Sequence, residues 1–230
     1  YLRTAEAIAQ ELDKTEVTRN ILQTSELTDT ITKIKVKLMQ VKDIRGTANR
    51  VTESQILDDI ELFELKAFSL LAMEIRELLL SANITVVTLP DLEPVVNILD
   101  PEKMRIPHFY VYDAYSPELA ALRAKMKTLK MDEKTEERVL DQLQFEHTEL
   151  EDRIREKLSE QIHPYKKEIN EALVNTATLD ILLAKAQQTI DMQLCKPEIS
   201  TSTTRYIKIF NPQVKEVLWQ EGKKFQAIDI

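Results

Sequence analysis

The sequence predicts an all-α protein, and three observations support that class. The 230 residues include only 2 glycines and 8 prolines, which leaves few positions for tight hairpins or phosphate-cradling loops. Charged residues make up 30% and hydrophobic residues 43% of the chain, a balance typical of amphipathic helices. The apolar residues recur every three or four positions over most of the chain. We therefore expect a helical core bundle, a protruding antiparallel two-helix lever and a short β segment at the C-terminus.

Residues 1–115 are expected to form the helical core. One helix is predicted over residues 1–23 and a second from Thr24 to Gly46, because helices commonly end at a glycine. The stretch Ile34–Leu38 also alternates like a strand. Helical spacing continues on both sides of it, however, and favours a helix.

A long apolar helix and an aromatic loop are expected to complete this core. The run from Thr52 to Gln55 has the form of a capping box. The helix behind it has an apolar stripe broad enough for a central position. Its apolar residues are Ile56, Leu57, Ile60, Phe63, Ala67, Leu70, Leu71, Ile75, Leu78 and Leu79. A short helix follows Pro90, and the aromatic residues 102–115 are predicted to be a loop or small hairpin held against the core.

Residues 116–190 are expected to form the lever. Ser116 followed by proline suits the N-cap and first position of a helix, and leucines at coiled-coil spacing come next. After a reversal, helical spacing resumes and is interrupted only by Pro164, which is predicted to kink the helix. A continuous helix over residues 133–190 would span roughly 85 Å. Because no globular core is that wide, part of it must project as an antiparallel pair with residues 116–131.

Residues 191–230 are expected to link the lever to a further domain. Two β-rich runs, Arg205–Phe210 and Phe225–Ile230, are predicted to be short strands. The chain opens at Tyr1 rather than at methionine and stops within the second run. We therefore expect both ends to be boundaries of a piece of a longer protein.

Few residues are arranged for catalysis or metal binding. No Gly-x-x-x-x-Gly-Lys-Ser/Thr run is present, which excludes nucleotide hydrolysis by a P-loop within these 230 residues. His108, His147 and His163 lack zinc-ligand spacing, and the Glu-x-x-His run that ends at His163 has no second copy for a di-metal bundle. We expect no catalytic residue and no metal site, and we expect His147 at the helix seam beside a carboxylate.

The single cysteine, Cys195, indicates a reducing compartment, and we expect a cytoplasmic protein. With no histidine beside it in the sequence, its thiol is expected to be buried and inert. No apolar run approaches the roughly 18 residues of a membrane span, so no membrane partner is expected.

The distribution of charge gives two basic groups to consider as contacts for nucleic acid. The net charge of −8 argues against tight DNA binding by this chain alone, because phosphate neutralisation dominates such binding. One basic group, expected to be a solvated helix face, consists of Lys33, Lys35, Lys37, Lys42, Arg45 and Arg50. The other lies at the lever tip and supplies the candidate DNA-binding residues Lys127, Lys130, Lys134 and Arg138. Acidic residues are interleaved with this second group, and the local balance favours a surface ion-pair lattice over a DNA contact.

Two runs in this sequence resemble the lever motifs of the MutS family of DNA mismatch repair proteins. The run from Asp113 to Arg123 resembles the Asp-x-x-Ser-x-Glu-Leu-x-x-Leu/Ile-Arg pattern that opens the ascending lever helix of that family. The run from Leu179 to Ala186 is similar to the Leu-Asp-x-Leu-x-x-x-Ala stretch where the descending helix re-enters the core. The resemblance therefore falls at the predicted ends of the lever.

Two shorter runs follow in the family's order. Cys195–Glu198 resembles the Cys-Arg-Pro-type link after the descending helix. The run from Asn211 to Val214 stands in the place of the His-Pro motif at the threshold of the ATPase domain. Together the four runs extend the resemblance over most of residues 90–230.

The resemblance implies a core-and-lever region that couples the ATP state of a dimeric ATPase to the grip of a clamp on DNA. It implies ATP and Mg as cofactors of the full-length protein, DNA and a second copy as its partners, and no enzymatic activity in this piece. It also places Phe225 against the adenine of ATP. Three departures point to a divergent MutS-like branch. No clamp domain fits between residues 131 and 140, no mismatch-reading domain lies within these 230 residues, which truncation would also explain, and Asn211 replaces the histidine of the His-Pro motif.

Two other interpretations explain part of the sequence. A coiled-coil structural or dimerisation module without a DNA role explains the helical spacing, but not the runs that begin at Asp113 and Leu179. A helical-bundle enzyme is disfavoured, because no constellation of polar residues indicates a reaction.

Overall fold

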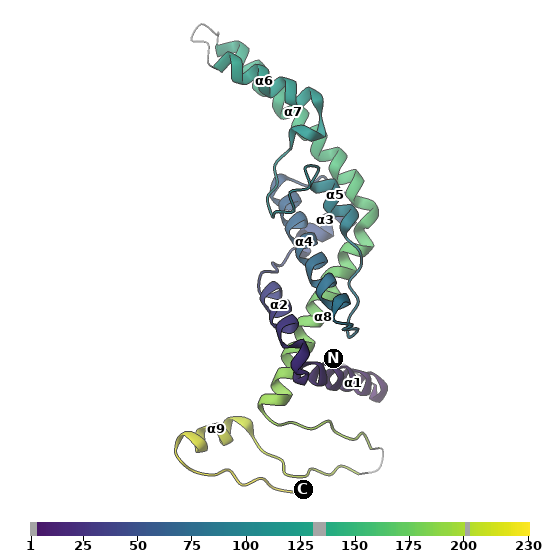
Figure 1. Ribbon diagram of the computed structural model, residues 1–230, viewed down its shortest axis with the longest axis vertical. Helices are drawn as coiled ribbons and strands as arrows, with labels where there is room; N and C mark the ends of the chain where they lie inside the picture. The colour runs from purple at the N-terminus through teal and green to yellow at the C-terminus, as the bar shows by residue number, and fades with distance from the viewer. Residues whose placement is uncertain (1–3, 131–136, 201–202) are drawn as a thin grey trace. The chain divides into compact units, whose positions relative to one another are not determined.

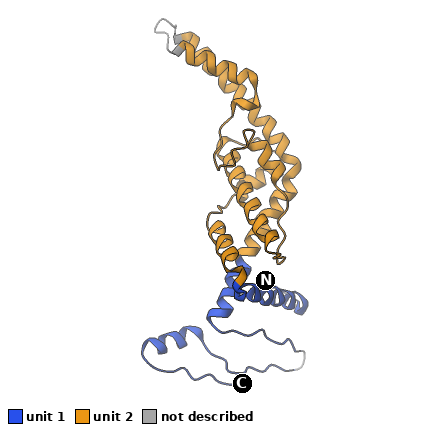
Figure 2. Cartoon of the chain, in the orientation of Figure 1, with its two compact units in different colours: residues 1–25, 181–230 blue, residues 26–180 orange. Residues whose placement is uncertain are grey.

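The computed structural model describes residues 4–130, 137–200 and 203–230. These residues are mainly helical and contain one isolated antiparallel bridge, so the predicted all-α class is confirmed. The chain divides into two compact units, coloured separately in Figure 2: residues 26–180 form the larger, and residues 1–25 with 181–230 form the smaller. The expected division by role at residues 115 and 190 stays a prediction.

The larger unit is built around one central helix (Figure 1). This helix, α4 (Asp59–Ser81), packs against α2, α3 and α5. Ten of its residues are buried, as a central position requires, although of the predicted stripe only Leu70, Ile75 and Leu79 are among them and Ile60 is exposed. The surrounding helices are α2 (Thr28–Leu38), α3 (Arg45–Thr52) and α5 (Glu93–Leu99), followed by a 3₁₀ turn at Asp113–Tyr115. As expected, residues 102–112 form a loop against this core.

The helix predicted from Thr24 to Gly46 is shorter in the structure. The helix expected to reach Gly46 ends at Leu38, and Gly46 lies in the first turn of α3. The Asp43 carboxylate accepts the Arg45 backbone N–H at 3.1 Å, which favours a new helix start there. The chain is therefore interrupted by a linker, residues 39–44.

The capping box lies six residues beyond the predicted position. Asp58 accepts the Glu61 N–H at 2.9 Å, and the Glu61 side chain accepts the Asp58 N–H at 2.9 Å. The predicted cap residue, Thr52, instead ends α3, where its hydroxyl donates to the Ala48 carbonyl oxygen. The prediction was wrong because either run satisfies the pattern, and only the fold selects one.

The predicted two-helix lever is present as an arm within the larger unit. Helix α6 (Pro117–Lys130) packs against α7 (Glu137–Ile162), and Figure 1 shows the pair extending past the core helices. The Ser116 hydroxyl accepts the Leu119 N–H, as expected for its N-cap position. We use "arm" for α6 together with residues 137–150 of α7. The reversal at residues 131–136 lies outside the described residues.

Pro164 interrupts the return helix as predicted. A 3₁₀ turn at His163–Tyr165 separates α7 from α8 (Lys166–Asp191). Proline has no N–H to donate and its ring crowds the preceding turn, so an α-helix cannot pass through it unchanged. The last residues of α8, from Ile181, belong to the smaller unit.

The smaller unit combines α1 (Ala5–Gln23), the end of α8 and a C-terminal segment. Within it Lys185 pairs with Glu11 at 2.5 Å. The two predicted strands reduce to one bridge, Ile209 with Ile228, flanked by a hydrogen-bonded pair formed by Tyr206 and Ile230.

A short helix between these two runs, α9 (Pro212–Gln220), was not predicted. Asn211 caps it, since its side chain accepts the Gln213 and Val214 N–H groups. Pro212 occupies the first helical position. Among the described residues, none of the helices combines the length and hydropathy that crossing a membrane would require.

Candidate functional site at the root of the arm

A buried lysine lies at the centre of α4. Lys66 is 0% exposed, and its ammonium donates to Asp100 Oδ1 at 3.0 Å and to the Tyr112 hydroxyl at 3.1 Å. The ammonium also lies 5.1 Å from the centroid of the Tyr112 ring. We call Lys66, Asp100 and Tyr112 the buried triad. A buried charge persists only when it is paired in this way.

Asp100 connects the triad to the loop that leads to the arm. It follows the last residue of α5, is 2% exposed, and its second oxygen accepts the Arg105 backbone N–H at 2.7 Å. Burial raises the pKa of this carboxyl, while the Arg105 N–H and the Lys66 ammonium lower it. The net result is a pKa below the ordinary value. Asp100 is therefore held as a carboxylate.

The aromatic residues of the same loop are fixed by hydrogen bonds and ring contacts. The Tyr112 hydroxyl donates to the His108 carbonyl oxygen at 2.9 Å, and its ring packs edge-on against Phe109 and Tyr115. The Tyr115 hydroxyl donates to the Ile98 carbonyl oxygen at 3.0 Å, and burial raises its pKa well above the ordinary range. The segment that enters α6 is thus fastened to α4 and α5.

Arg123 of α6 joins that segment to α7. Its guanidinium donates to the Val111 carbonyl oxygen at 2.8 Å, to Asp113 Oδ1 at 2.5 Å and to Glu151 Oε1 at 2.7 Å. Burial lowers the pKa of Arg123, but the Asp113 and Glu151 carboxylates raise it more. A planar guanidinium presents five N–H donors in a fixed fork, so it can hold several partners at once in defined directions.

Glu151 connects Arg123 to the core through Arg155. Its other oxygen lies 3.4 Å from Arg155, and Arg155 forms a bidentate pair with Asp59 at 2.8 and 3.0 Å. Asp59 is the first residue of α4. We call Asp113, Arg123, Glu151, Arg155 and Asp59 the ion-pair chain. It runs from the loop through α6 and α7 to the start of α4.

His147 lies at the helix seam beside a carboxylate, as predicted. Its Nε2 accepts the Arg123 Nε–H at 3.1 Å and lies 3.3 Å from Glu151 Oε1. Together the buried triad and the ion-pair chain form the arm root. Its groups pair with one another and connect α4, α5, the loop, α6 and α7.

The candidate DNA-binding residues are only partly described. Lys127 of α6 and Arg138 of α7 are exposed near the end of the arm. Lys130 is the last residue of α6, but its side chain lies outside the described residues, as does Lys134. The structure therefore places two of the four on the arm surface and does not test their role.

Three members of the other basic group form ion pairs with acidic side chains. Lys37 pairs with Glu74 at 2.6 Å, Arg45 with Asp43 at 2.5 Å, and Arg50 with Glu61 at 3.1 Å. Lys33, Lys42 and Arg45 are exposed, so the group remains largely at the surface, with ion pairs to acidic neighbours.

Phe225 and Cys195 lie in the smaller unit. Phe225 is half-buried and lines an open hollow with Phe210 and Ile228, and its contact with adenine stays a prediction. Cys195 is exposed, so the prediction of a buried thiol was wrong. It follows the end of α8, where the chain has left the packed helix. Among the described residues, no three histidine, cysteine or acidic side chains are grouped as metal ligands.

One feature of the sequence, a lysine within an apolar stripe, could have indicated the buried triad. Lys66 interrupts the apolar stripe of α4 between Phe63 and Leu70, and an ionic side chain in such a stripe implies a buried partner. That partner is 34 residues away and is not identifiable from spacing alone. No model of a known protein family and no curated protein sequence matches the chain.

Proposed function

We propose that this chain is the core-and-lever region of a MutS-like DNA repair protein and is non-catalytic by itself. The observation that carries the proposal is a two-helix arm whose root is joined to the core by the buried triad and the ion-pair chain. A rigid arm converts a small rotation at its base into a large displacement at its tip. Such a device suits the transmission of an ATP-dependent movement to a clamp on DNA.

The residues that carry the family resemblance support this role. Asp113 and Arg123, the first and last residues of the lever motif, form an ion pair at the arm root. In the second motif, Leu179, Leu182 and Ala186 are buried along α8. These motif residues thus make structural contacts at both ends of the lever.

The proposal assigns the remaining activities to the full-length protein. ATP and Mg would bind a P-loop domain that follows residue 230, with Phe225 against the adenine. DNA would contact the arm tip through Lys127, Lys130, Lys134 and Arg138. We further propose a homodimer in the cytoplasm.

The gene beyond the codon for Ile230 tests this proposal directly. A P-loop within some tens of residues is the expected result, because the family places its ATPase domain there. A stop codon at that position would contradict the proposal.

A dimerisation module without a DNA role is the second candidate. It is favoured by Phe145 on α7, whose side chain is 64% exposed on the arm. A dimer through the arm predicts a doubled mass by light scattering that Phe145→Asp reduces to a monomer. The lever proposal predicts that this substitution leaves the mass unchanged.

A further inference from the structure

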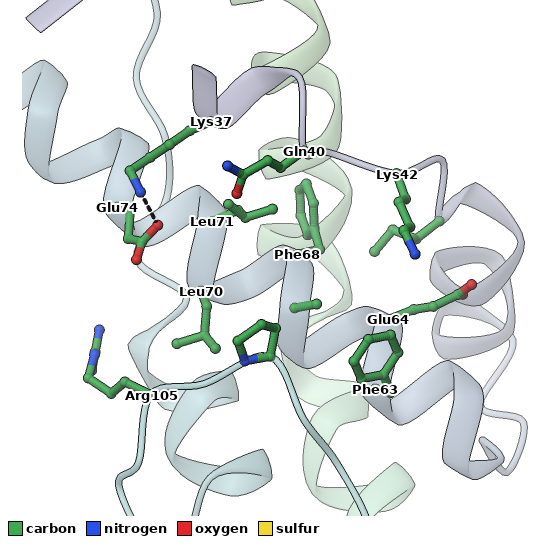
Figure 3. Close-up of a pocket in the computed structure, with 13 residues that line it drawn as sticks. Lys37, Gln40, Lys42, Phe63, Glu64, Phe68, Leu70, Leu71, Glu74 and Arg105 are labelled. Atoms are coloured by element: carbon green, nitrogen blue, oxygen red, sulfur yellow. Dashed lines mark hydrogen bonds and ion pairs between the residues drawn. The ribbon is translucent and has the colours of Figure 1, made fainter. Parts of the chain in front are cut away.

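A pocket of about 400 Å³ opens on the side of α4 in the larger unit (Figure 3). Its walls are the end of α2, the linker 39–44, the middle of α4 and the loop around Arg105 and Pro107. Its volume falls in the range of small-molecule sites. No member of the buried triad or of the ion-pair chain belongs to its wall, so it is a separate feature.

The floor of the pocket is apolar. It is formed by consecutive turns of α4, with the side chains of Phe63, Ala67, Phe68, Leu70 and Leu71. Phe63, Ala67 and Leu71 are only half-buried, although Phe68 and Leu70 belong to the core. The chain leaves this apolar surface partly exposed to water. An apolar ligand that covers it therefore binds favourably, because burying apolar surface lowers the free energy.

The rim carries three cations. Lys37 is neutralised by Glu74 at 2.6 Å, and Arg105 pairs with Glu93 at 2.8 Å. Lys42 of the linker is exposed and has no ion pair among the described residues. The Glu64 carboxylate, also on the rim, accepts the Thr47 hydroxyl at 2.7 Å and points toward α3 in Figure 3.

We propose that this pocket binds a small molecule with an apolar body and a single anionic head. The body would cover the half-buried floor, and the head would pair with Lys42. A neutral molecule of the same shape would gain no attraction from that exposed ammonium, so charge complementarity favours the anion.

Ligand binding in the pocket would affect the arm root through Arg105. Arg105 lines the pocket, and its backbone N–H donates to Asp100 of the buried triad. This consequence rests on the lever function proposed above. Ligand binding itself does not, because the pocket is defined by the chain alone.

Decanoate is a suitable probe, and decanol is its neutral counterpart. Titration of the 230-residue chain, followed by amide chemical shifts, is expected to show saturable binding of one decanoate. The shifts should centre on residues 40–44, 63–71 and 105–107. Decanol is expected to bind more weakly.

Two variants test the assignment of the site. Lys42→Glu should weaken decanoate binding by about fivefold, because it replaces an exposed ion pair with repulsion. Lys33→Glu makes the same charge change on an exposed lysine of α2 outside the pocket and should leave affinity unchanged. Ala67→Phe should fill the pocket and remove binding, with helicity by circular dichroism as the check on folding.

Several outcomes would overturn the proposal. Absence of saturable binding, equal affinity for decanol, or equal weakening by Lys42→Glu and Lys33→Glu would each do so. Shifts confined to the hollow around Phe225 would also contradict it. Binding at the pocket without a shift of the Arg105 amide would contradict only the link to the arm root.

Discussion

At the scale of single residues, Lys66 shows what the larger unit requires of its core. Removing an ammonium from water costs several kcal/mol, and pairing with Asp100 and Tyr112 offsets much of that cost. An apolar side chain of similar size would fill the same space without that cost. We infer that the lysine fixes where the loop enters α6, since its donors define one position for Asp100 and Tyr112.

Replacing Lys66 with methionine is expected to destabilise the protein by about 3–5 kcal/mol, because Asp100 is left as an unpaired buried carboxylate. Urea unfolding followed by circular dichroism measures the change. Lys33→Met, at an exposed lysine on α2, is the matched control and should change stability by less than about 0.5 kcal/mol. Equal effects of the two substitutions would show that the triad is not a stabilising contact.

Asp100 also predicts how stability depends on pH. Its pKa in the folded protein lies below the ordinary value of 3.8, so the unfolded chain binds more protons in the interval between the two values. The free energy of unfolding should therefore fall as pH decreases from about 4 through the folded pKa. Asp100→Asn should flatten the curve in that interval. An unchanged slope in the variant would contradict the assignment.

At the scale of elements, sequence spacing was sufficient where one helix face is apolar throughout. It predicted the positions of α1, α4, α5 and the two arm helices, and Ser116 marked the start of α6. The start of α3 and the short helix α9 were missed, because each depends on one local side-chain contact, at Asp43 and Asn211.

The ion pairs within the arm root could not be predicted from sequence spacing, for a different reason. Arg155 and Asp59 are 96 residues apart in the sequence, and Arg123 and Glu151 are 28 apart. Only the packing of α7 against the core selects these partners from the many acids and bases of a chain that is 30% charged. Charge content thus predicted ion pairs but not their identity.

Arg123 predicts the local stability of the arm. Arg123→Ala removes charge-assisted hydrogen bonds to three elements and should speed hydrogen exchange in α6 by about tenfold or more. The comparison is Arg153→Ala on α7, since Arg153 is exposed and its ion pair with Glu149 is long, at 3.9 Å. Exchange mass spectrometry on both variants separates the two effects. Similar exchange in α6 of the two variants would contradict the role of Arg123.

At the scale of the whole chain, charge governs the expected contact with DNA. With a net charge of −8, the 230 residues alone should bind duplex DNA weakly at low salt and not measurably at moderate salt. Fluorescence anisotropy with a labelled duplex measures this. In a longer protein that binds DNA, Lys127→Glu with Arg138→Glu should reduce the salt slope by about 2, if both contact phosphate. An unchanged slope would remove these residues from the DNA interface.

A rigid arm is the central claim, and a distance distribution across its root tests it most directly. Spin labels at Lys127→Cys on α6 and Asn97→Cys on α5, in a Cys195→Ser background, report on the arm relative to the core. A second pair of labels, at Glu77→Cys and Asn97→Cys, gives the width of the distance distribution between two positions within the core. Double electron–electron resonance should show one distance for the arm pair, nearly as narrow as the core pair and broadened by Arg123→Ala. A broad or multiple distribution in the otherwise unaltered arm would contradict the account.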